Sequence, residues 1–379
     1  MKIGFFTDLF YPFVGGGEVY HLNLETRLVK LGIEVVHVTS RLPNTNFFED
    51  YGGIKIYRIP IFTKNYKRGR FLSLLTILTK LKIFKDVDII QVATYPTALN
   101  GWFIGKILKK PTILFCHEFF RESWNYMRES FFSKKVYPLV EDYIGRCPYD
   151  WFICPSNFSR ESLIKCGAEE NKITVAYHGI DPIFNPKVSG DDLRKSLGLE
   201  DKLVFGFSGR LSDIGQKGIP YLLEATKIVT NELHEACLVL GGTGFEEVKP
   251  FLKKLKIEKF VVYAGKRPFS EMPKFYRMCD IVAGASITEG FGFMYAEASR
   301  CGKAVVATNA GSLPEIILNG KTGILVPPRD SKALAEAIIE LLTDKKKAEK
   351  MGKRGAKYTE KFTWENSVRK HLEVYEMFV

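Results

Sequence analysis

Two carboxylates, Glu289 and Glu297, stand eight residues apart in the segment ITEGFGFMYAEASRCG. The residues between them are almost all apolar, and glycines flank the aromatic Phe291. The preceding DIVAGAS is typical of a strand, so we expect 287–292 to be its exit loop and 293–301 a helix. The helix amino terminus, which favours an anion, would then lie between the carboxylates. The pattern predicts a site for an anion with hydroxyl-rich groups on either side, since two ordinary surface glutamates would not need such apolar surroundings.

Arg210 and Lys217 place two cations in FSGRLSDIGQKGIPYLLEA, a glycine-bearing loop between a buried strand and a helix. Arginine can bind two oxygens of a diphosphate at once, and lysine adds a point charge. The segment does not match G-x-x-x-x-G-K-[ST], so it is not a P-loop. We predict a diphosphate-binding loop, with an ordinary solvated loop as the alternative.

A third candidate, VGGGEVY at 14–20, is a glycine loop that opens a helix. Gly16 and Gly17 would let the backbone approach a ligand closely. The segment is not G-x-G-x-x-G, and Glu18 in the first helical turn disfavours a phosphate. A tight strand-to-helix turn is the alternative.

His117 ends the strand segment PTILFCH and could bond a substrate hydroxyl, although a lone histidine is often structural. Asp86 and Asp88 form a D-x-D pair of the kind that holds a metal in some enzymes. Here the pair precedes a strand instead of following one, so we interpret it as a polar turn. Seven cysteines without C-x-x-C spacing give no zinc pattern. The sequence therefore predicts no metal site.

Strand and helix patterns alternate along the chain, which predicts βαβ units and parallel sheets. In the first half, strands are expected in KIGFFTD, IEVVHVTS, DVDIIQV, PTILFCH, DWFICPS and ITVAYHG, with later helices at 97–110, 121–146 and 157–166. In the second half, strands are expected in LVFGFSG, ACLVLGG, FVVYAG, DIVAGAS and KAVVAT, with a first helix at 219–231. This predicts an α/β protein with two doubly wound domains joined near 180–192. Ligands bind beyond the carboxyl ends of such strands, so two facing sheets would put the candidate residues on both walls of a cleft.

The length of 379 residues also favours two domains. MKIGFF runs directly into a strand, so we expect no signal peptide, and no apolar window of about 18 residues predicts a membrane span. The unpatterned cysteines are typical of a reducing compartment, which favours the cytoplasm. Glutamine occurs only twice beside abundant lysine and glutamate, a composition typical of thermophiles.

The net charge of +12 is concentrated in one region, because residues 51–117 hold twelve lysines and arginines against two acids. Residues 70–86 follow Lys64, Lys67 and Arg68 and show helical spacing with one apolar face. We therefore expect that segment 64–85 could lie on an anionic membrane surface, with an ordinary sheet-covering helix as the alternative. No nucleic-acid-reading motif accompanies the charge, so nucleic acid is not predicted as a partner.

E-G-F-G-x-x-x-x-E, followed by A-x-x-x-G-K-A-V-V-A-T-x-x-G-x-x-P-E-I and G-K-T-G-I-L-V-P-P-R-D, resembles the retaining glycosyltransferases of family 4, which have the GT-B fold. The opening βαβ unit, the SGRL…KG loop and the closing FTWENSVRKHLEVYEMF extend the resemblance over nearly the whole chain. It implies two facing Rossmann-like domains, an acceptor-binding domain at 1–182 and a donor domain at 183–358. A C-terminal helix at 359–379 would pack back towards the first domain.

The resemblance implies hexosyl transfer from a nucleotide-diphosphate sugar to a hydroxyl acceptor, with retention of configuration and with neither a metal nor a bound cofactor. Glu289 would bond donor sugar hydroxyls, Glu297 the ribose, and His117 a hydroxyl next to the reacting carbon. Arg210 and Lys217 would hold the diphosphate and offset charge on the leaving group. Glu289 is poorly placed in the sequence as a lone general base, so electrostatic support fits better.

The remaining implied donor contacts lie on glycine turns and at the start of the helix at 293–301. They are Gly16, Gly17, Gly209, Gly242, Arg267, Gly290, Phe291, Gly292, Phe293 and Met294.

The chain departs from the family pattern at 310–312, where G-G is common, at His178, often asparagine, and at Ala304, usually proline. These departures bear on donor choice more than on reaction type. A UDP, GDP or ADP donor, a lipid-linked or envelope-glycan acceptor and the oligomeric state all remain open. A sugar-nucleotide epimerase or phosphorylase on the same fold is one alternative, and a non-catalytic anion- or nucleic-acid-binding protein is another.

Overall fold

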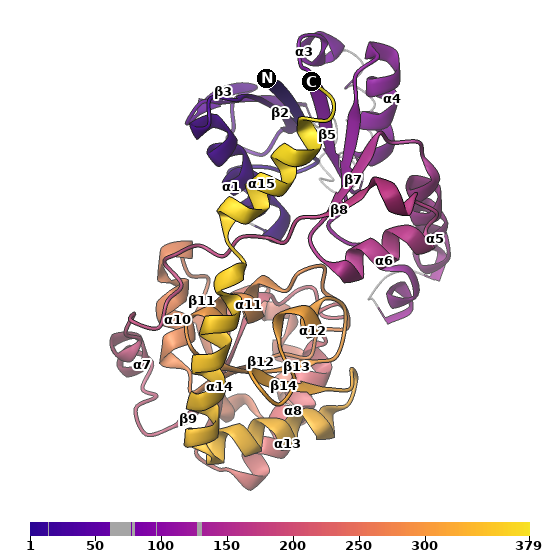
Figure 1. Ribbon diagram of the computed structural model, residues 1–379. Helices are drawn as coiled ribbons and strands as arrows, with labels where there is room; N and C mark the ends of the chain where they lie inside the picture. Colours follow the sequence, from indigo (N-terminus) through magenta and orange to yellow (C-terminus); the bar gives the residue numbers. More distant parts are fainter. Residues whose placement is uncertain (14, 61–76, 78–79, 96, 127–130) are drawn as a thin grey trace. The chain divides into compact units, whose positions relative to one another are not determined.

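The computed structural model describes residues 1–13, 15–60, 77, 80–95, 97–126 and 131–379 (Figure 1). The chain forms two compact units. Unit 1 comprises Met1–Arg121, Val136–Gly179 and Trp364–Val379, and unit 2 comprises Glu122–Lys135 and Ile180–Thr363. Each unit has its own sheet with helices packed on it, so the predicted α/β class is confirmed. None of the described helices combines the length and the apolarity needed to cross a bilayer.

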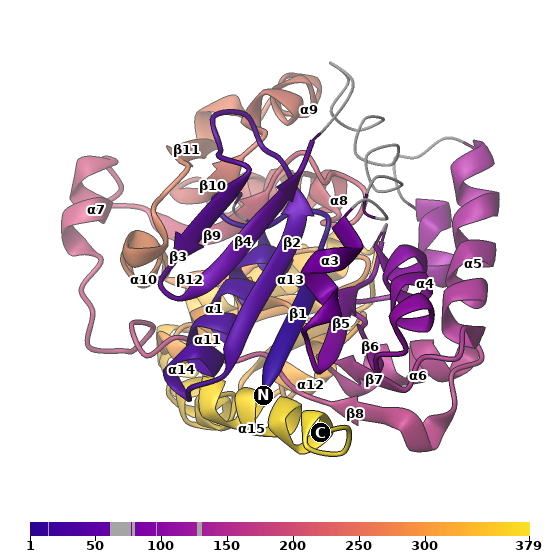
Figure 2. The same ribbon diagram turned by 90° about the horizontal axis from the view of Figure 1, so that it is seen from above.

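The sheet of unit 1 has the order β3-β4-β2-β1-β5-β6-β7-β8. Figure 2 shows the first five of these strands, β3, β4, β2, β1 and β5, side by side. The strands of this sheet are β1 Lys2–Phe6, β2 Glu34–Ser40, β3 Phe48–Tyr51, β4 Ile54–Ile59, β5 Ile89–Ala93, β6 Thr112–Phe115, β7 Trp151–Cys154 and β8 Ile173–Val175. All neighbours are parallel except β3 and β4. This hairpin was not predicted. Gly52 and Gly53, with φ of +60° and +88°, form its tight turn, and a Gly-Gly pair is the signal that could have revealed it.

The helices of unit 1 follow the βαβ prediction, with differences. They are α1 Gly16–Lys30, α3 Leu81–Lys85, α4 Ala98–Leu108, α5 Phe131–Arg146, α6 Asn157–Lys165 and α15 Trp364–Tyr375, of which α5 belongs to unit 1 only from Val136 on. The helical stretch predicted at 121–146 is confirmed in part, because α5 covers its larger part and Arg121–Tyr126 is a 3₁₀ helix. Most of the helix predicted at 70–86 lies outside the described residues, as do Lys64, Lys67 and Arg68, and α3 is its described end.

Unit 2 has a six-stranded parallel sheet in the order β11-β10-β9-β12-β13-β14. Its strands are β9 Leu203–Arg210, β10 Ala236–Thr243, β11 Val261–Gly265, β12 Ile281–Ala283, β13 Ala304–Thr308 and β14 Gly323–Val326. Its helices are α7 Asp191–Ser196, α8 Ile219–Glu232, α9 Lys249–Leu255, α10 Met272–Met278, α11 Phe293–Arg300, α12 Leu313–Ile316, α13 Ser331–Thr343 and α14 Lys345–Tyr358. The helices predicted at 219–231 and 293–301 are confirmed as α8 and α11.

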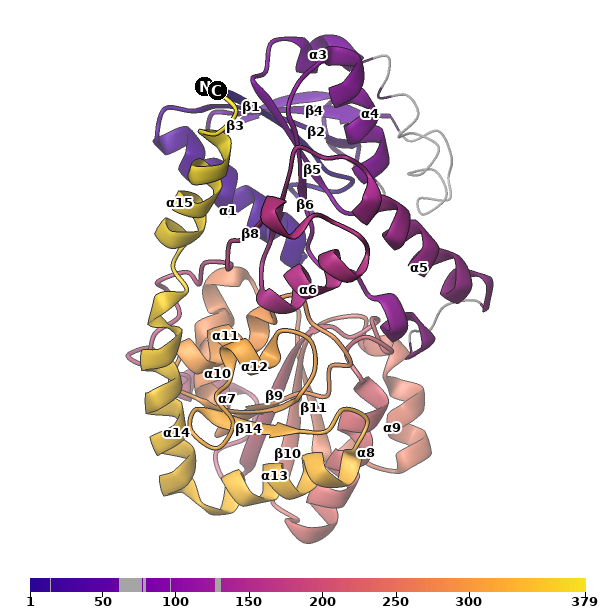
Figure 3. The same ribbon diagram turned by 45° about the vertical axis from the view of Figure 1, so that its right-hand side comes forward.

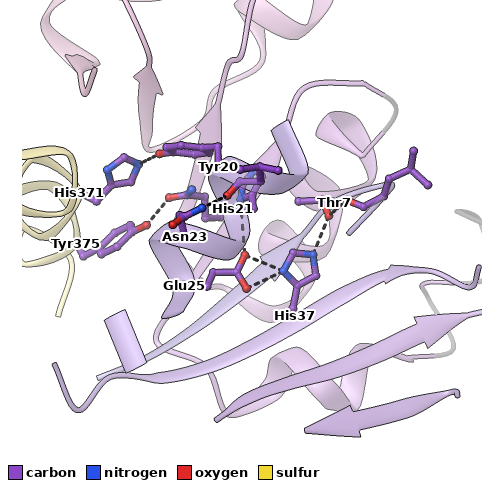
Figure 4. A network of polar contacts seen from close by, with 11 residues as sticks. Thr7, Tyr20, His21, Asn23, Glu25, His37, His371 and Tyr375 are labelled. Atoms are coloured by element: carbon purple, nitrogen blue, oxygen red, sulfur yellow. Dashed lines mark hydrogen bonds and ion pairs between the residues drawn. The ribbon is translucent and has the colours of Figure 1, made fainter. Parts of the chain in front are cut away.

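The helix α15 lies alongside α1 in unit 1 (Figure 3). The Tyr20 hydroxyl is 2.6 Å from His371 Nε2, and the Tyr375 hydroxyl donates to Gln91 Oε1 at 2.6 Å (Figure 4). His371 Nδ1 donates to the Ser367 carbonyl at 2.8 Å, and burial lowers the pKa of His371 to about 4. The ring is therefore neutral near pH 7, and Tyr20 donates to it. Two buried hydrogen bonds thus join α15 to α1 and β5.

A second polar group fixes α1 to β2. The Glu25 carboxylate oxygens lie 2.8 and 2.9 Å from His37 Nδ1, and His37 Nε2 lies 2.7 Å from Thr7 Oγ1 (Figure 4). Thr7 donates its own proton to the Leu9 carbonyl, so His37 Nε2 donates to Thr7. Burial raises the pKa of Glu25 and lowers that of His37, which favours a neutral pair sharing one proton between Glu25 and Nδ1.

Candidate functional site

Glu289 is the centre of the polar cluster at the carboxyl edge of the unit 2 sheet. It follows β12 and is only 8% exposed. Lys217 Nζ lies 2.8 and 3.0 Å from its two carboxylate oxygens, and the Ser286 hydroxyl donates to Oε1 at 2.7 Å. The Tyr295 hydroxyl is 2.9 Å from Ser286 Oγ and donates to it, because the Ser286 proton is already used. Two exit loops and α11 therefore supply the partners that a buried carboxylate requires.

The contact between Lys217 and Glu289 was not predicted from the sequence. The sequence assigned Lys217 to a diphosphate and Glu289 to a sugar, whereas the structure pairs their charges directly. A ligand in this place would meet a matched ion pair, not a lone cation and a lone anion. A diphosphate would have to share Lys217 with Glu289.

Two glycines allow the exit loops to touch backbone to backbone. Gly218 has φ +59°, and a Cβ there would lie 1.9 Å from the Ala285 carbonyl oxygen. Gly311 has φ +58°, and a Cβ there would lie 2.4 Å from the Glu289 carbonyl oxygen. The Ile287 N–H donates to Gln216 at 2.8 Å, and the Ser312 N–H donates to the Glu289 carbonyl at 2.9 Å. The loops after β9, β12 and β13 are thereby fixed around Glu289.

Arg210 lies at the end of β9, not in the loop where the sequence placed it. Its side chain is 53% exposed, with Nε 3.0 Å from an Asp213 carboxylate oxygen. Gly209 and Gly242 pair in register on β9 and β10, and a Cβ on Gly242, at φ +115°, would lie 1.9 Å from the Gly209 carbonyl oxygen. These two glycines allow the strand ends to pack closely, and Arg210 stays exposed to solvent at that edge.

Glu297 lies on α11 and is partly buried. Its Oε2 accepts a hydrogen bond from the Tyr276 hydroxyl at 2.7 Å. Burial raises the pKa of Glu297 to about 8, while the bond from Tyr276 opposes part of that increase. The eight residues from Glu289 are not two turns of one helix, because α11 begins only at Phe293, after Gly292 in the left-handed region.

The residues between the two glutamates form a packed exit loop and the start of α11. Phe291 is buried and meets Phe293 edge to face at 5.3 Å, and Met294 Sδ accepts the Ser208 N–H at 3.1 Å. Gly290 is buried in the exit loop. These side chains hold the amino terminus of α11, and its first backbone N–H groups are the part suited to an anion.

Arg267 follows β11 and makes local contacts. Its Nε donates to the Ala264 carbonyl at 3.1 Å, and Nη1 lies 3.2 Å from Glu271. In the sheet, β10 and β9 separate β11 from β12. The structure therefore places Arg267 at the sheet edge of unit 2 but does not join it to the Glu289 cluster.

In unit 1, His117 follows β6 and lies against the start of α1. A Cβ on Gly17 would be 3.2 Å from ring atoms Cε1 and Nε2, so the missing side chain makes room for the ring. Gly16 is the first residue of the same helix. The His117 N–H donates to Thr94 at 3.3 Å, and the Ser159 hydroxyl donates to the His117 carbonyl at 3.3 Å. Burial lowers the pKa of His117 to about 4, so near pH 7 the neutral ring can offer one donor and one acceptor.

Glu141 supports the segment after His117, and sequence reasoning missed it. It is fully buried and accepts the N–H groups of Phe120 and Arg121, each at 2.8 Å, together with the Tyr95 hydroxyl. Nothing in the segment LVEDYIGR distinguishes this carboxylate from one on a solvated helix face. Ser286 and Tyr295 were missed too, although Ser286 ends a predicted strand and so carried a positional signal.

The polar-turn interpretation of the D-x-D pair agrees with the structure. Asp88 accepts the N–H of Lys2, the first residue of β1, at 2.7 Å, and Asp86 is the C-terminal capping residue of α3. The described parts of the chain contain no group of three or more His, Cys, Asp or Glu placed to hold a metal.

Two family models match the chain. One described as glycosyl transferases group 1 matches residues 189–358, and one described as glycosyltransferase family 4 matches residues 14–184. An uncharacterized glycosyltransferase of Methanocaldococcus jannaschii is 28% identical over 397 aligned positions, which cover 100% of this chain and 98% of the relative. The alpha-monoglucosyldiacylglycerol synthase of Streptococcus pneumoniae is 28% identical over 355 positions, which cover 90% of this chain and 78% of the relative. The solved structure of Anabaena HepE in complex with UDP and glucose has a TM-score of 0.81 at 22% identity, covering 100% of both chains.

Gly218→Ala tests the backbone contact between the exit loops. The new Cβ meets both an unfavourable φ and the Ala285 carbonyl, so we expect a loss of about 2–5 kcal/mol in the free energy of unfolding. Gly198→Ala is the matched control, because Gly198 has φ +66° with no atom within 4 Å of the added Cβ. It should lose only about 1–2 kcal/mol. Equal losses in urea denaturation would contradict the close contact.

Glu297→Gln tests the raised pKa. Between the ordinary value of 4.5 and about 8, the folded chain holds a proton on Glu297 that the unfolded chain has released. Stability contributed by this group therefore falls as pH rises through that window. From pH 5 to pH 8, the melting temperature of the unmodified protein should therefore fall relative to that of Glu297→Gln, in which this carboxyl no longer titrates. Tyr276→Phe, which removes the opposing hydrogen bond, should steepen the decline. Parallel melting profiles for all three proteins would show that Glu297 titrates normally.

Proposed function

Because the chain belongs to the GT-B-fold glycosyltransferases of family 4 and group 1, which transfer sugars from nucleotide sugars, we propose that it moves a hexosyl unit to a hydroxyl acceptor with retention of configuration and without a metal ion. The cluster of Glu289, Lys217 and Ser286 carries this proposal. It gathers a buried carboxylate and a cation at the carboxyl edge of a parallel sheet, beside the amino terminus of α11.

Each member of the cluster has a distinct proposed role. Sugar hydroxyls donate to Glu289, whose oxygens are held in place by Lys217 and Ser286. Lys217 and the first N–H groups of α11 offset the negative charge that develops on the leaving diphosphate. Since both oxygens of Glu289 already accept from Lys217, electrostatic support of the sugar suits this carboxylate better than proton abstraction.

Glu297 is proposed to accept the ribose hydroxyls of the nucleotide. A raised pKa means that a substantial fraction of this carboxyl carries a proton near pH 7 in the ligand-free chain. Two donating hydroxyls favour the ionised form, so nucleotide binding should release that proton. Arg210, exposed at the end of β9, is the proposed second cation for the diphosphate.

His117 is proposed to bond a hydroxyl next to the reacting carbon, as the family resemblance implies. Its neutral ring suits that role, because it can donate from one nitrogen and accept at the other. Gly16 and Gly17 are proposed to approach the donor with backbone atoms only.

The acceptor is proposed to be lipid-linked. The name of the Streptococcus pneumoniae relative describes a synthase of a glucosyl diacylglycerol. Segment 64–85 contributes the basic and apolar residues that would suit an anionic bilayer, and Lys82 and Lys85 are exposed at its described end. A phosphorylase or an epimerase on the same fold would not form a glycoside with such an acceptor.

Glu289→Gln is the decisive variant for the transfer reaction. The donor is first identified by the thermal shift that UDP-, GDP- and ADP-sugars produce, because a true donor stabilises the fold by mass action. Turnover with that donor should fall by about 100-fold or more in Glu289→Gln, since an interaction made in the transition state is lost. The anomeric proton of the product, read by NMR, should show the configuration of the donor.

The matched control is Glu340→Gln, which removes a carboxylate from a half-exposed lysine pair in the same unit. It should leave turnover within about twofold, as surface ion pairs contribute little. Equal turnover in Glu289→Gln and Glu340→Gln would reject the proposed site. An inverted product would reject retention while leaving the transferase activity intact.

Vesicle flotation tests the membrane proposal separately. At low salt, the protein should float with vesicles that contain phosphatidylglycerol, because juxtamembrane cations each add about 1 kcal/mol near an anionic surface. Exchange of Lys64, Lys67 and Arg68 for glutamate should abolish flotation. A triple variant that floats as well as the unmodified protein would exclude this segment as the docking surface.

A further inference from the structure

A cavity of about 400 Å³ lies in unit 2, away from the Glu289 cluster. It is lined at the sheet by Asp280, which precedes β12, and by Ala304, the first residue of β13. Glu289 and Gly311 follow the carboxyl ends of the same two parallel strands. The cavity therefore opens at the amino edge of the sheet, opposite the proposed donor site.

The lining of this cavity is predominantly cationic. Its charged side chains are Arg277, Lys303, Lys345, Lys353, Asp280 and Glu349. Asp280 already has other partners. Its oxygens lie 3.1 and 3.2 Å from the Arg194 guanidinium, and one of them accepts the Val204 N–H at 2.7 Å. Glu349 is exposed. Four cations therefore line the cavity, and Glu349 is the one lining carboxylate that is not paired with Arg194.

Lys303 is the most constrained of these cations. It is partly buried at the turn between α11 and β13, and no ion pair joins it to any carboxylate of the described segments. Burial and the nearby Arg277 lower the pKa of Lys303, and the attraction of Asp280 opposes only part of that decrease. A bound anion would relieve both effects.

Arg277 is held in a fixed orientation at the same cavity. Its Nε donates to the Val188 carbonyl at 2.9 Å, and Nη1 donates to the Cys301 carbonyl at 3.3 Å, at the end of α11. A guanidinium anchored by two backbone carbonyls loses little conformational entropy when it binds a ligand. Lys345 begins α14, at the corner where α13 ends (Figure 3).

The rest of the lining is apolar, contributed by Leu341 and Leu342 of α13, Ala348 of α14, Ala304 and Pro186. Mixed apolar walls with a few convergent charges are typical of small-molecule sites. A volume of about 400 Å³ is larger than a single phosphate needs, so it leaves room for the body of a small phosphorylated molecule.

We propose that this cavity binds a phosphate group, gripped by Arg277 and Lys303, with Lys345 and Lys353 at its mouth. Arginine and lysine are the usual pair for such an anion, since one offers a planar fork and the other a point charge. The group can come from a free phosphorylated metabolite or from a phospholipid headgroup. The site is separate from the proposed donor site and does not depend on it.

Isothermal titration calorimetry with inorganic phosphate, at constant ionic strength in chloride, tests the proposal on the full chain. Lys303→Met should weaken phosphate binding by about tenfold or more, because the buried cation is lost. Lys346→Met is the matched control, since Lys346 is exposed on α14 beside Lys345 but does not line the cavity. Lys217→Gln, in the proposed donor site, should leave this binding unchanged.

Absence of binding in the unmodified protein, or equal binding by Lys303→Met, would overturn the proposal. Loss of binding in Lys217→Gln alone would place the phosphate in the donor site and overturn it as well. If Lys303→Met fails to fold, Lys353→Gln, at an exposed position, takes its place with the same expectation. A short-chain monomeric phosphatidate identifies the source: binding at least about tenfold tighter than phosphate indicates a headgroup that also uses Leu341 and Leu342, and equal binding indicates a free metabolite.

Discussion

The buried charge of Glu289 is the constraint on which the unit 2 site depends. A carboxylate removed from water is tolerated only beside a cation and hydrogen-bond donors, and no single loop of this chain provides them. Lys217 comes from the loop after β9, while Ser286 and Tyr295 come from the β12 loop and α11. A parallel sheet delivers all these loops to one edge, and Gly218 and Gly311 let their backbones touch there. The site is therefore a property of the whole sheet edge and not of a local motif.

Unit 1 also buries titratable side chains, but most of those around α1 are neutral. Burial keeps His117 and His371 uncharged near pH 7, and Glu25 and His37 favour a neutral pair. The buried hydrogen bonds of these four side chains consequently need no compensating ions, whereas the buried Arg58 elsewhere in unit 1 pairs with Glu49 at 2.8 Å. Glu141 accepts two backbone N–H groups and a tyrosine hydroxyl around the segment that follows His117. Glu289 is thus stabilised by an ion pair, whereas His117 is buried as a neutral ring.

The sequence predicted most strands, the helices α8 and α11 and the position of Glu289 after β12, because apolar periodicity and glycine turns depend on near neighbours in the chain. It did not predict contacts between residues far apart in the chain. The ion pair of Lys217 with Glu289, the bond from Tyr276 to Glu297 and the support from Glu141 join residues 72, 21 and about 20 positions apart. Such contacts depend on which strands become neighbours, and no local spacing encodes that order. The antiparallel β3 was missed for a simpler reason, since its Gly-Gly turn was not used.

The polypeptide leaves unit 1 at Gly179 and re-enters it at Trp364, so the first and last residues of the chain belong to the same unit. The hydroxyl of Tyr20 and the amide oxygen of Gln91 are hydrogen-bonded to His371 and Tyr375 of α15. During synthesis the ribosome completes unit 2 before it releases α15, although α1 and β5 emerge first. Unit 2, nearly continuous in the sequence, can therefore form its own contacts before α15 is available, whereas unit 1 gains the hydrogen bonds of Tyr20 and Gln91 only once α15 has been added.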